Sequence, residues 1–395
     1  MTNEDKVVIT ISELKKMIKN NEEDKIDEID IVTAGTCGIM SGAMAVLHFE
    51  IGGHKKVKKF DKIYLNGIPG KIGPCPNEYL GKVDLTIYGT EYRGKYGGGF
   101  LFKDLIKGKE IEVVATFGNN TINKSITIED IETCRLIGTR MAYKNYSAIT
   151  NIGNEPIKTI FHRRSIKKGE CSFSGCGEIN PLQNMCILYE NEIIGKRVLI
   201  NGSEGIILGF GTRSTINMPN LMISGDMKKM DSYYIGGFIT SDGVEVFNTV
   251  SIPIEVNDKH KEYLKTLDKD IDLPIRDILG REIIDVGKYS EVWGDVEYRP
   301  NINVYRCRNC DNCIPMSMCP TNAIIRVEHL GGRPLPTEDC FGCGVCGNSC
   351  PYGIYSIKLG SVKGIPITCR QSDRERAIKL CKDLKRRIEK GEFKI

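Results

Sequence analysis

The sequence CRNCDNCIPMSMCP at residues 307–320 and the sequence CFGCGVCGNSCP at residues 340–351 organise the rest of this chain. Each stretch places three cysteines two residues apart and then adds a fourth cysteine followed by proline. Three thiolates at that interval bind three irons of one cubane, and the fourth cysteine binds the cluster of the other stretch. The pattern therefore predicts two [4Fe–4S] clusters, and we expect this part of the chain to carry electrons.

The crossed pairing, which is that of bacterial ferredoxins, divides the eight cysteines into two ligand sets. The first set is Cys307, Cys310, Cys313 and Cys350, and the second is Cys340, Cys343, Cys346 and Cys319. Five residues separate Cys313 from Cys319, against three between Cys346 and Cys350, so we expect the longer loop to change how well Cys319 is shielded. Two structural zinc sites are the alternative, because zinc also takes four cysteines from C-x2-C pairs. The triplets with a trailing C-P favour iron–sulfur.

Length and composition are those of an ordinary globular protein of two or three domains. The chain has 395 residues, of which 41% are hydrophobic and 27% charged. The net charge of +4 is too small to indicate a nucleic-acid partner. The predicted clusters use eight of the 16 cysteines, and free thiols beside clusters indicate a reducing, cytoplasmic compartment.

We expect neither a signal peptide nor contact with a membrane. The first ten residues lack a basic region followed by an apolar run. The least polar long stretch, residues 31–49, is interrupted by Gly35, Gly38 and Gly42, which suits a buried core better than a bilayer span.

Short apolar runs separated by glycine turns dominate the first 290 residues and predict an α+β protein. We expect a mixed α/β domain with glycine-rich loops and a β-hairpin-rich part at residues 196–238, followed by a small ferredoxin-like α+β domain. Residues 11–21 read as a helix with Ser12 as N-cap, and residues 258–281 as a charged helical connection. The glycines at the start do not form G-x-G-x-x-G, so no dinucleotide fold is predicted.

A change in composition around Trp293 and Pro300 places a domain boundary. We expect a first domain over residues 1–290, a two-cluster domain over 300–362 and a C-terminal part over 363–395 that holds a basic amphipathic helix.

Three further cysteines are candidates for sulfur chemistry. Cys134 is the first choice, because the positive charges of Arg135 and Arg140 nearby in sequence favour the thiolate that attacks or carries sulfur. Cys37 lies in a predicted glycine-rich turn, and Cys75 lies on a loop made rigid by proline. For each, a small buried thiol is the alternative.

Arginines near these segments are candidates for holding an anionic group. Arg135, Arg140 and Arg213 are the three we name, since guanidinium forks match carboxylate, sulfonate or phosphate oxygens. A surface turn is the alternative for Arg213. The spacing of Cys171, Cys176 and Cys186 matches no strong ligand pattern, so a further metal site there stays open.

Several separate motifs resemble one family in the same order along the chain. They are IVTAGTCGIMSGA (31–43), YGGGFLFKDLIKGKE (96–110), TRMAYKNY (139–146), NGSEGIILGFGTRS (201–214) and PNLMISGDM (219–227). These resemble the homocysteine-biosynthesis domain family, and with the ferredoxin part the architecture resembles the methanogenesis marker 16 metalloproteins. In the homocysteine branch a cysteine commonly occupies the place of Ser41, whereas here a cysteine sits earlier, at Cys37, and Cys134 matches a family cysteine better.

The resemblance implies an enzyme that inserts sulfur reductively into a small anionic aldehyde. Sulfoacetaldehyde, giving 2-mercaptoethanesulfonate for coenzyme M, is the substrate implied for this branch, and aspartate semialdehyde, giving homocysteine, is the alternative. Such a reaction needs a sulfide or persulfide donor and a low-potential electron donor, and it needs an acid such as Tyr143 or His162 to protonate the departing oxygen. A homo-oligomer stays open.

A protein of another class also fits the sequence, namely a carrier that delivers electrons or sulfur to a partner enzyme without chemistry of its own. An enzyme requires Cys134 and the arginines to converge on a closed pocket. A carrier requires only a cluster near the surface and a docking face. The position of Cys134 relative to a pocket and to the clusters discriminates between them.

Overall fold

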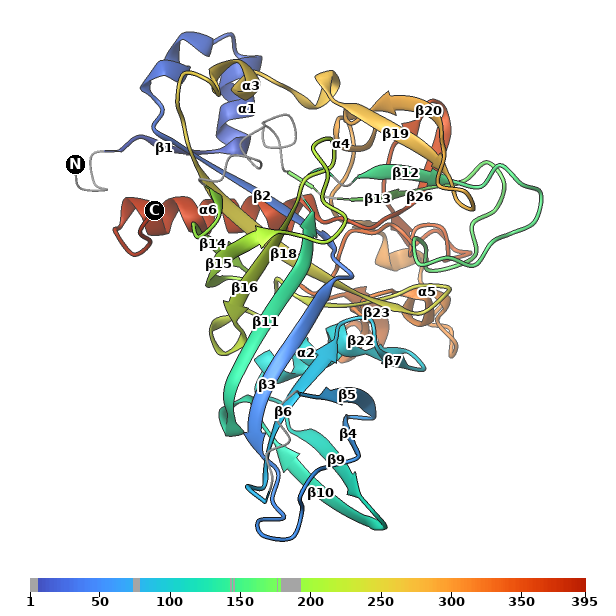
Figure 1. Ribbon diagram of the computed structural model, residues 1–395. Coiled ribbons are helices and arrows are strands. Elements are labelled where there is room, and N and C mark those ends of the chain that lie inside the picture. The colour runs from blue at the N-terminus through green and yellow to red at the C-terminus, as the bar shows by residue number, and fades with distance from the viewer. Residues whose placement is uncertain (1–5, 74–78, 143, 145, 176, 179–192) are drawn as a thin grey trace.

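A broad β-sheet carries most of the chain before the cysteine-rich stretches (Figure 1). The computed structural model describes residues 6–73, 79–142, 144, 146–175, 177–178 and 193–395. Over these residues the sheet has fourteen strands in the order β1-β2-β18-β14-β15-β16-β11-β3-β6-β5-β4-β9-β10, with β17 paired to β18. The bounds, in that order, are Val8–Thr10, Ile31–Ile39, Val244–Glu255, Arg197–Ile200, Ser203–Phe210, Asn220–Asp226, Ile131–Ala142, Ala43–Glu50, Lys82–Tyr88, Ile68–Ile72, Lys62–Leu65, Ile111–Phe117, Asn120–Ile126 and, for β17, Gly236–Ile239.

A second sheet combines segments from both sides of the cysteine-rich stretches. Its order is β20-β19-β12-β13-β26-β25, with bounds Ile283–Lys288, Asp272–Asp277, Ser147–Thr150, Cys171–Ser174, Ile365–Arg370 and Ser361–Val362. Three small ribbons complete the strands: β21 (Asn301–Ile302) with β24 (Tyr355–Ser356), β22 (Ile324–Val327) with β23 (Arg333–Pro336), and β7 (Tyr92–Arg93) with β8 (Tyr96–Gly97). Because β26 pairs with β13, the chain returns to the body of the protein after the cysteine-rich segment.

The described α-helices are few and mostly short. Their bounds are α1 Ile11–Lys19, α2 Gly98–Ile106, α3 Lys261–Leu264, α4 Ser290–Trp293, α5 Ile314–Met318 and α6 Arg374–Glu389. The N-cap of α1 is Thr10 rather than the predicted Ser12, because Thr10 and Glu13 form a reciprocal capping box. No helix in the described part of the chain is long and apolar enough to cross a membrane.

The predicted mixed α/β fold with a cysteine-rich C-terminal part is confirmed, and its body is rich in strands, but two further local predictions were wrong. Residues 258–281 contain only the short α3 and then β19, because Ile271, Leu273 and Ile275 are buried in alternation, which is the period of a strand. Cys37 lies on β2, not in a turn, because the glycine-rich stretch continues as a fully buried strand.

The glycines of β2 allow other backbone to approach the strand closely. A Cβ added at Gly35 would lie 2.7 Å from Cys381 Sγ of α6, and one at Gly38 would lie 2.2 Å from the carbonyl oxygen of Gly175. Thr33 Oγ1 donates to the carbonyl oxygen of Cys381 at 3.0 Å. The C-terminal helix is therefore seated directly on β2, as Figure 1 shows.

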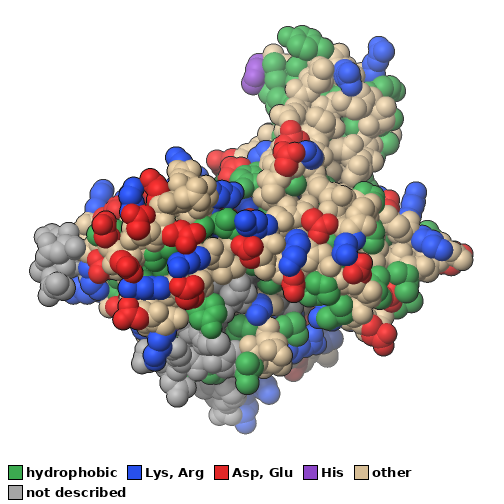
Figure 2. Space-filling model, turned by 90° about the horizontal axis from the view of Figure 1, so that it is seen from above, with side chains coloured by type: hydrophobic (Ala, Val, Ile, Leu, Met, Phe, Trp, Pro, Cys, Tyr) green, Lys and Arg blue, Asp and Glu red, His purple; other side chains and the backbone are tan. Residues whose placement is uncertain are grey.

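Charged side chains of both signs are interspersed on the face shown in Figure 2. This mixture agrees with the small net charge of +4. It gives that face no patch of one sign that would attract a polyanion.

Candidate functional site

Four cysteines line one small cavity near the surface, and we call them the outer cysteine set: Cys307, Cys310, Cys313 and Cys350. Cys310 is exposed and the other three are half-buried. Burial, followed by the charges of Cys307 and Cys350, raises the pKa of Cys313. The backbone N–H of Asn309 donates to Cys307 Sγ at 3.4 Å. Thiols that interact electrostatically and accept hydrogen bonds from backbone N–H groups are suited to bind a cluster.

The inner cysteine set, defined as Cys319, Cys340, Cys343 and Cys346, is more enclosed. Cys319 and Cys343 are each 8% exposed. Burial, and after it the charges of Cys340 and Cys319, raises the pKa of Cys346 to about 12. The backbone N–H of Ala323 donates to Cys319 Sγ at 3.2 Å. The five residues of the longer loop form α5, and Cys319 at its end is buried.

The arrangement of these thiols does not suit a single metal ion. Within the described ranges, no group of three or more His, Cys, Asp or Glu side chains is placed to hold one ion. Ligands of one zinc lie about 2.3 Å from it and crowd together, whereas a cubane holds its four thiolates further apart. The residues present fit iron–sulfur clusters better than structural zinc.

A buried guanidinium beside the inner set also fits a cluster. Arg370 is 1% exposed, its backbone N–H donates to the carbonyl oxygen of Cys343 at 3.0 Å, and its Nη2 donates to the carbonyl oxygen of Gly342 at 3.2 Å. Its Nε and Nη1 find no hydrogen-bond partner. A buried cation without a carboxylate is costly unless another anion compensates it. A cluster held by four thiolates is such an anion.

The inner set packs directly against the large sheet. Cys343 belongs to one buried cluster with Cys37 of β2, Phe247 of β18 and Phe341. The ring centroids of Phe247 and Phe341 are 4.9 Å apart. The backbone N–H of Asp373, at the start of α6, donates to the carbonyl oxygen of Cys37 at 3.0 Å. The inner set, β2 and the start of α6 therefore form one continuous packed region.

Beyond the end of β2, three other segments come together at the turn that follows the strand: β11, the β15–β16 loop, and β18, whose Val246 accepts from the N–H of Met40 at 2.9 Å. Thr139 of β11 donates to the carbonyl oxygen of Gly42 through both its N–H and its Oγ1, each at 3.0 Å. The N–H of Thr212, in the β15–β16 loop, donates to the carbonyl oxygen of Thr139 at 2.7 Å. The pairing of β11 with β16 shifts between Gly138 and Met141. This β-bulge changes the direction in which the side chains of β11 point where the segments meet.

These segments bring four polar side chains together, which we call the convergence site: Ser41, Arg140, Arg213 and Glu245. Burial, and after it the charge of Arg213, lowers the pKa of Arg140, while Glu245 opposes this shift. Arg213 holds a φ of 60°, a left-handed conformation that is uncommon for a long side chain and typical of functional loops. Two neighbouring guanidiniums, here those of Arg140 and Arg213, form a binding place for an anion.

Glu245 is the buried acid of this site. Its side chain lies on β18, is 6% exposed and leaves Oε2 without a hydrogen-bond partner. Burial raises the pKa of Glu245 against the opposing effects of a hydrogen bond from Ser41 and the charge of Arg140. A carboxyl with these properties retains its proton at higher pH than an ordinary glutamate, which suits a proton donor.

The structure separates Cys134 from the arginines expected to activate it. Cys134 is 2% exposed in the core, and burial raises its pKa to about 12, with Asp226 adding to the shift. Arg135 points away from it, and its Nε donates to Ser224 Oγ at 3.1 Å. Arg140 follows six positions later on β11, which corresponds to about 20 Å. The expected lowering of the Cys134 pKa was therefore wrong, because burial outweighs charges that lie elsewhere.

The remaining candidates are placed as follows. Cys37 is fully buried, Thr249 Oγ1 donates to its Sγ at 3.1 Å, and burial raises its pKa strongly. His162 is buried, and burial lowers its pKa to about 4, so its ring is neutral near neutral pH. Cys171 is buried on β13. Four residues lie outside the described ranges: Cys75, Tyr143, Cys176 and Cys186.

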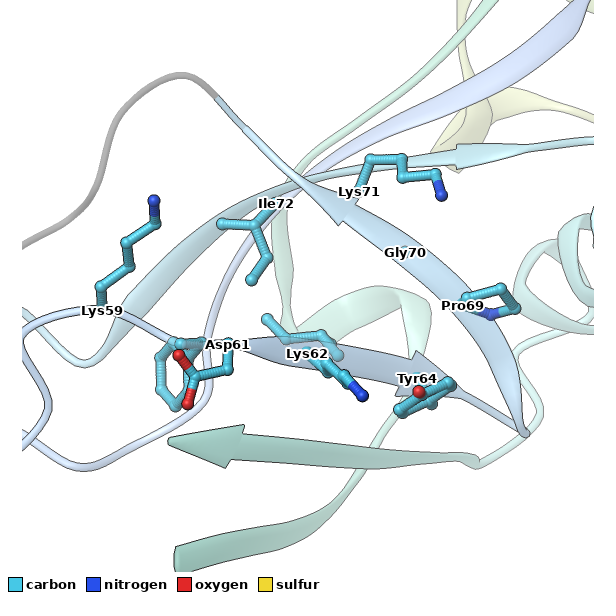
Figure 3. Close-up of a pocket in the computed structure, with 10 residues that line it drawn as sticks. Lys59, Asp61, Lys62, Tyr64, Pro69, Gly70, Lys71 and Ile72 are labelled. Carbon is cyan, nitrogen blue, oxygen red and sulfur yellow. The ribbon is translucent and has the colours of Figure 1, made fainter. Parts of the chain in front are cut away.

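Larger grooves occur away from these residues. The groove in Figure 3 is about 550 Å³ and is lined by residues 59–64 and 69–72 of the β4–β5 region, with Lys59, Asp61 and Lys71 among its side chains. It holds neither a cysteine nor a histidine. Its lysines and single acid give it no catalytic constellation, so we place the chemistry elsewhere.

Sequence reasoning missed Glu245 and the use of Ser41 as its partner. Glu245 pairs with Phe238 in the β17–β18 ladder, in a strand whose residues 244–254 are all buried. A single carboxyl within the apolar run VEVFNTVSIPI is a signal that the sequence displays. Its proximity to Ser41 depends on the pairing of β18 with β2, which no local motif reveals.

Comparison with known proteins identifies the relatives of this chain. A family model described as homocysteine biosynthesis enzyme, sulfur-incorporation, matches residues 6–395. An uncharacterized protein of Methanocaldococcus jannaschii is 58% identical over 98% of both chains. The L-aspartate semialdehyde sulfurtransferase of the same organism is 30% identical over 69% of this chain and 55% of its own length.

The cysteine-rich part has relatives of a different kind. The arsenate respiratory reductase iron–sulfur subunit of a Shewanella species is 33% identical over 55 residues, which are 14% of this chain and 23% of that protein. This similarity indicates iron–sulfur clusters in the cysteine-rich segment. No solved structure matches the chain.

Proposed function

We propose that this chain, which belongs to the homocysteine biosynthesis family of sulfur-incorporating enzymes, converts a small anionic aldehyde into a thiol by reductive insertion of sulfur. The substrate we favour is sulfoacetaldehyde, and the product is then 2-mercaptoethanesulfonate, the thiol of coenzyme M. This assigns the chain to the branch of methanogenesis marker 16 proteins. The observation that carries the proposal is the position of Arg140 next to both Arg213 and the buried carboxyl of Glu245.

The reaction requires a sulfur atom, electrons and protons in balance. An aldehyde R-CHO combines with H₂S, two electrons and two protons to give R-CH₂-SH and water. The carbon–oxygen bond breaks, a carbon–sulfur bond forms, and the carbonyl carbon is reduced. Iron–sulfur clusters, when bound, supply single electrons at low potential.

Arg140 and Arg213 hold the anionic end of the substrate in this proposal. The planar fork of a guanidinium matches the oxygens of a sulfonate or carboxylate. Arg140 is half-buried, so a charge-assisted hydrogen bond there is screened less than at the surface. The aldehyde carbon of a short substrate then lies within reach of Ser41 and Glu245.

Glu245 donates the proton that the departing oxygen needs. Its Oε2 is without a hydrogen-bond partner, and burial raises the pKa of the carboxyl, so it retains its proton to higher pH than an ordinary glutamate. Ser41 orients the group through its hydrogen bond. Glu245 takes the role expected of Tyr143 or His162. His162 does not suit it, because its buried ring hydrogen-bonds Thr368 Oγ1 at 3.2 Å and burial lowers its pKa to about 4.

The sulfur atom comes from an external sulfide or persulfide donor. None of the described cysteines lies in the convergence site, and the place where the homocysteine branch commonly has a cysteine is Ser41. Cys134 and Cys37 are buried with raised pKa values, so neither presents a thiolate to a substrate.

Aspartate semialdehyde is a second candidate substrate, supported by one specific feature. Its ammonium group requires an acidic partner, and Glu245 lies beside the arginines. A relative named L-aspartate semialdehyde sulfurtransferase is 30% identical to this chain. We favour the sulfonate because burial raises the pKa of Glu245 and so disfavours the carboxylate that an ammonium group would need.

A carrier function is the candidate from another class. The distance of Cys134 from the arginines is the observation that favours it, because a sulfur-carrying cysteine at the arginines was the feature expected of an enzyme. The convergence site stands against it, since a carrier needs no buried acid beside a guanidinium.

The test uses anaerobically purified protein with its clusters reconstituted. Each aldehyde is supplied separately with sulfide and a low-potential reductant, and new thiol is identified by mass. We expect 2-mercaptoethanesulfonate from sulfoacetaldehyde, lost in Arg213→Gln and retained in Arg135→Gln. If homocysteine is the only thiol formed, the substrate is aspartate semialdehyde rather than sulfoacetaldehyde. If neither aldehyde yields a thiol while the clusters are intact, the enzyme proposal is wrong and the carrier function remains.

A further inference from the structure

Arg370 is a buried cation whose charge no described carboxylate neutralises directly. Its guanidinium lies 4.5 Å above the ring centroid of Trp293, and Nη2 donates to the carbonyl oxygens of Glu297 and Gly342 at 2.6 and 3.2 Å. Among the described residues it forms no ion pair, although the charge of the Asp373 carboxylate acts on it. A guanidinium carries its positive charge throughout the neutral pH range. A fold tolerates such a group only where another negative charge is near.

Two more guanidiniums surround the inner cysteine set. Arg376 Nη1 donates to the carbonyl oxygen of Cys340 at 2.7 Å, and Arg299 pairs with Asp373 at 2.9 Å. Arg376 also pairs with Asp373, whose side chain is fully buried. Arg299 and Arg376 thus share one buried carboxylate, and together with Arg370, which forms no ion pair, they leave positive charge in excess at this place. Glu375, 3.5 Å from Arg299, is 46% exposed and is screened by solvent.

The outer cysteine set has a different electrostatic setting. Its nearest hydrogen-bonded cation is Arg326, whose Nη2 donates to the carbonyl oxygen of Cys310 at 2.6 Å. Arg326 and Cys310 are both exposed, so water and salt screen this charge. The charges at the inner set act through a drier medium and are felt more strongly.

Burial and positive charge oppose each other at the inner set. A cluster with four thiolates is an anion and becomes more negative when reduced, so burial alone would make reduction harder. A fixed cation nearby favours the more negative, reduced state. The unpaired Arg370 therefore decides how easily the inner set accepts an electron relative to the outer set.

We propose that Arg370 is the counter-ion of the inner iron–sulfur cluster and holds its reduction potential above that of the outer cluster, so that electrons pass inward. Each transfer oxidises the outer cluster by one electron and reduces the inner cluster by one. An external one-electron donor of low potential restores the outer cluster. The proposal rests on the proposed function only for the use made of the electrons.

The large sheet connects the inner cysteine set to the convergence site, where the electrons would be used. Cys37 and Ile39 lie two residues apart on β2 and pair with Thr249 and Phe247 of β18, and Glu245 lies two residues from Phe247, on the same face of β18. Cys37 and Phe247 belong to the buried cluster that contains Cys343. Phe247 and Glu245 are two residues apart on β18, which corresponds to about 7 Å along the strand. The inner set therefore faces the same strip of the sheet as the convergence site.

The test is a redox titration of the full reconstituted chain followed by electron paramagnetic resonance. The signal of each cluster is assigned with Cys310→Ala, which removes an outer ligand. In the unaltered protein we expect the inner cluster to be reduced first. In Arg370→Gln we expect the inner midpoint potential to fall while the outer one is unchanged. Arg326→Gln is the matched control and shifts only the outer potential.

Two further variants keep the proposal testable if Arg370→Gln fails to fold. Arg370→Lys keeps the charge and is expected to stay near the original inner potential, and Arg299→Gln removes a charge at a less buried position and lowers it. Iron content is measured for every variant. An inner potential unchanged in Arg370→Gln, an equal shift of both clusters, or an outer cluster reduced first in the unaltered protein would overturn the proposal. No aldehyde or sulfur donor is used, so a failure of the proposed function leaves this result readable.

Discussion

Arg213 lies close enough to Arg140 for its charge to lower the pKa of the Arg140 guanidinium, in addition to the larger effect of burial. Like charges held together repel, and an anion between them relieves the repulsion. Neither guanidinium forms an ion pair with an acidic side chain in the described ranges. Arg140 and Arg213 therefore form a site suited to bind an external anionic ligand.

Replacing Arg213 by glutamine is expected to weaken substrate binding. A charge-assisted hydrogen bond contributes about 1.5–3 kcal/mol, which corresponds to a rise in KM of roughly 10- to 150-fold. Steady-state kinetics of thiol formation measures this rise. Arg135→Gln is the control, because Arg135 is bonded to Ser224 and should leave KM unchanged. Equal effects of both variants would contradict the assignment of the anion site.

Replacing Glu245 by glutamine is expected to lower kcat by about 10²- to 10⁴-fold, the contribution of general acid catalysis. Burial raises the pKa of Glu245, so activity that depends on its proton falls as pH rises through that pKa. The glutamine variant should lose this dependence on pH. Ser41→Ala should have a smaller effect, since it removes only the orienting hydrogen bond. An unchanged pH profile in Glu245→Gln would rule Glu245 out as the acid.

The same variant separates the two aldehydes. If the substrate carries an ammonium group, loss of the Glu245 carboxylate raises KM as well as lowering kcat. If the substrate is a sulfonate, KM stays within about threefold and only kcat falls. Whether KM rises together with the fall in kcat therefore shows which of the two aldehydes is the substrate.

Replacing Cys134 by alanine is expected to lower stability and to leave activity intact. Cys134 is a small buried hydrophobe at 2% exposure, and its truncation should cost about 1 kcal/mol in the free energy of unfolding. Denaturant unfolding and the thiol assay measure the two effects. Loss of thiol formation in a folded variant with full iron content would return the sulfur-carrying role to Cys134.

His162 is expected to make the protein sensitive to mild acid. Burial lowers its folded-state pKa from 6.5 to about 4, and the unfolded chain therefore binds a proton first as pH falls. Stability then decreases between about pH 6.5 and 4, by on the order of 3 kcal/mol when the whole window is crossed. Unfolding free energies at both ends of this window, at equal iron content, should depend less on pH in His162→Gln. An equally steep dependence in that variant would assign the effect to another group.

Local spacing predicted the cysteine sets, whereas the convergence site required long-range pairing. Cysteines two residues apart must lie close together in any fold, so three ligands of each predicted set follow from local spacing, and the fourth follows from the ferredoxin pattern. Ser41 and Glu245 meet only because β2 and β18 are neighbours in the sheet. The register of strands so distant in sequence follows from packing of the whole sheet, which local patterns do not contain.

The prediction for Cys134 failed for a reason that is specific to strands. Neighbouring side chains on a strand point to opposite faces, so the charge of Arg135 is directed to solvent while Cys134 enters the core. Sequence proximity was taken as spatial proximity. The β-bulge before Met141 likewise re-aims Arg140 toward the β15–β16 loop, and such an irregularity is not visible in the motif.

A single-turnover experiment tests the central claim most directly. The reconstituted chain is reduced, excess reductant is removed, and sulfoacetaldehyde and sulfide are added without a further electron source. If the two clusters supply the electrons, both are oxidised as thiol appears, at about one thiol per chain, since each reduced cluster gives up one electron. Clusters that stay reduced in the presence of aldehyde and sulfide, with no thiol formed, would contradict reductive sulfur insertion by this protein.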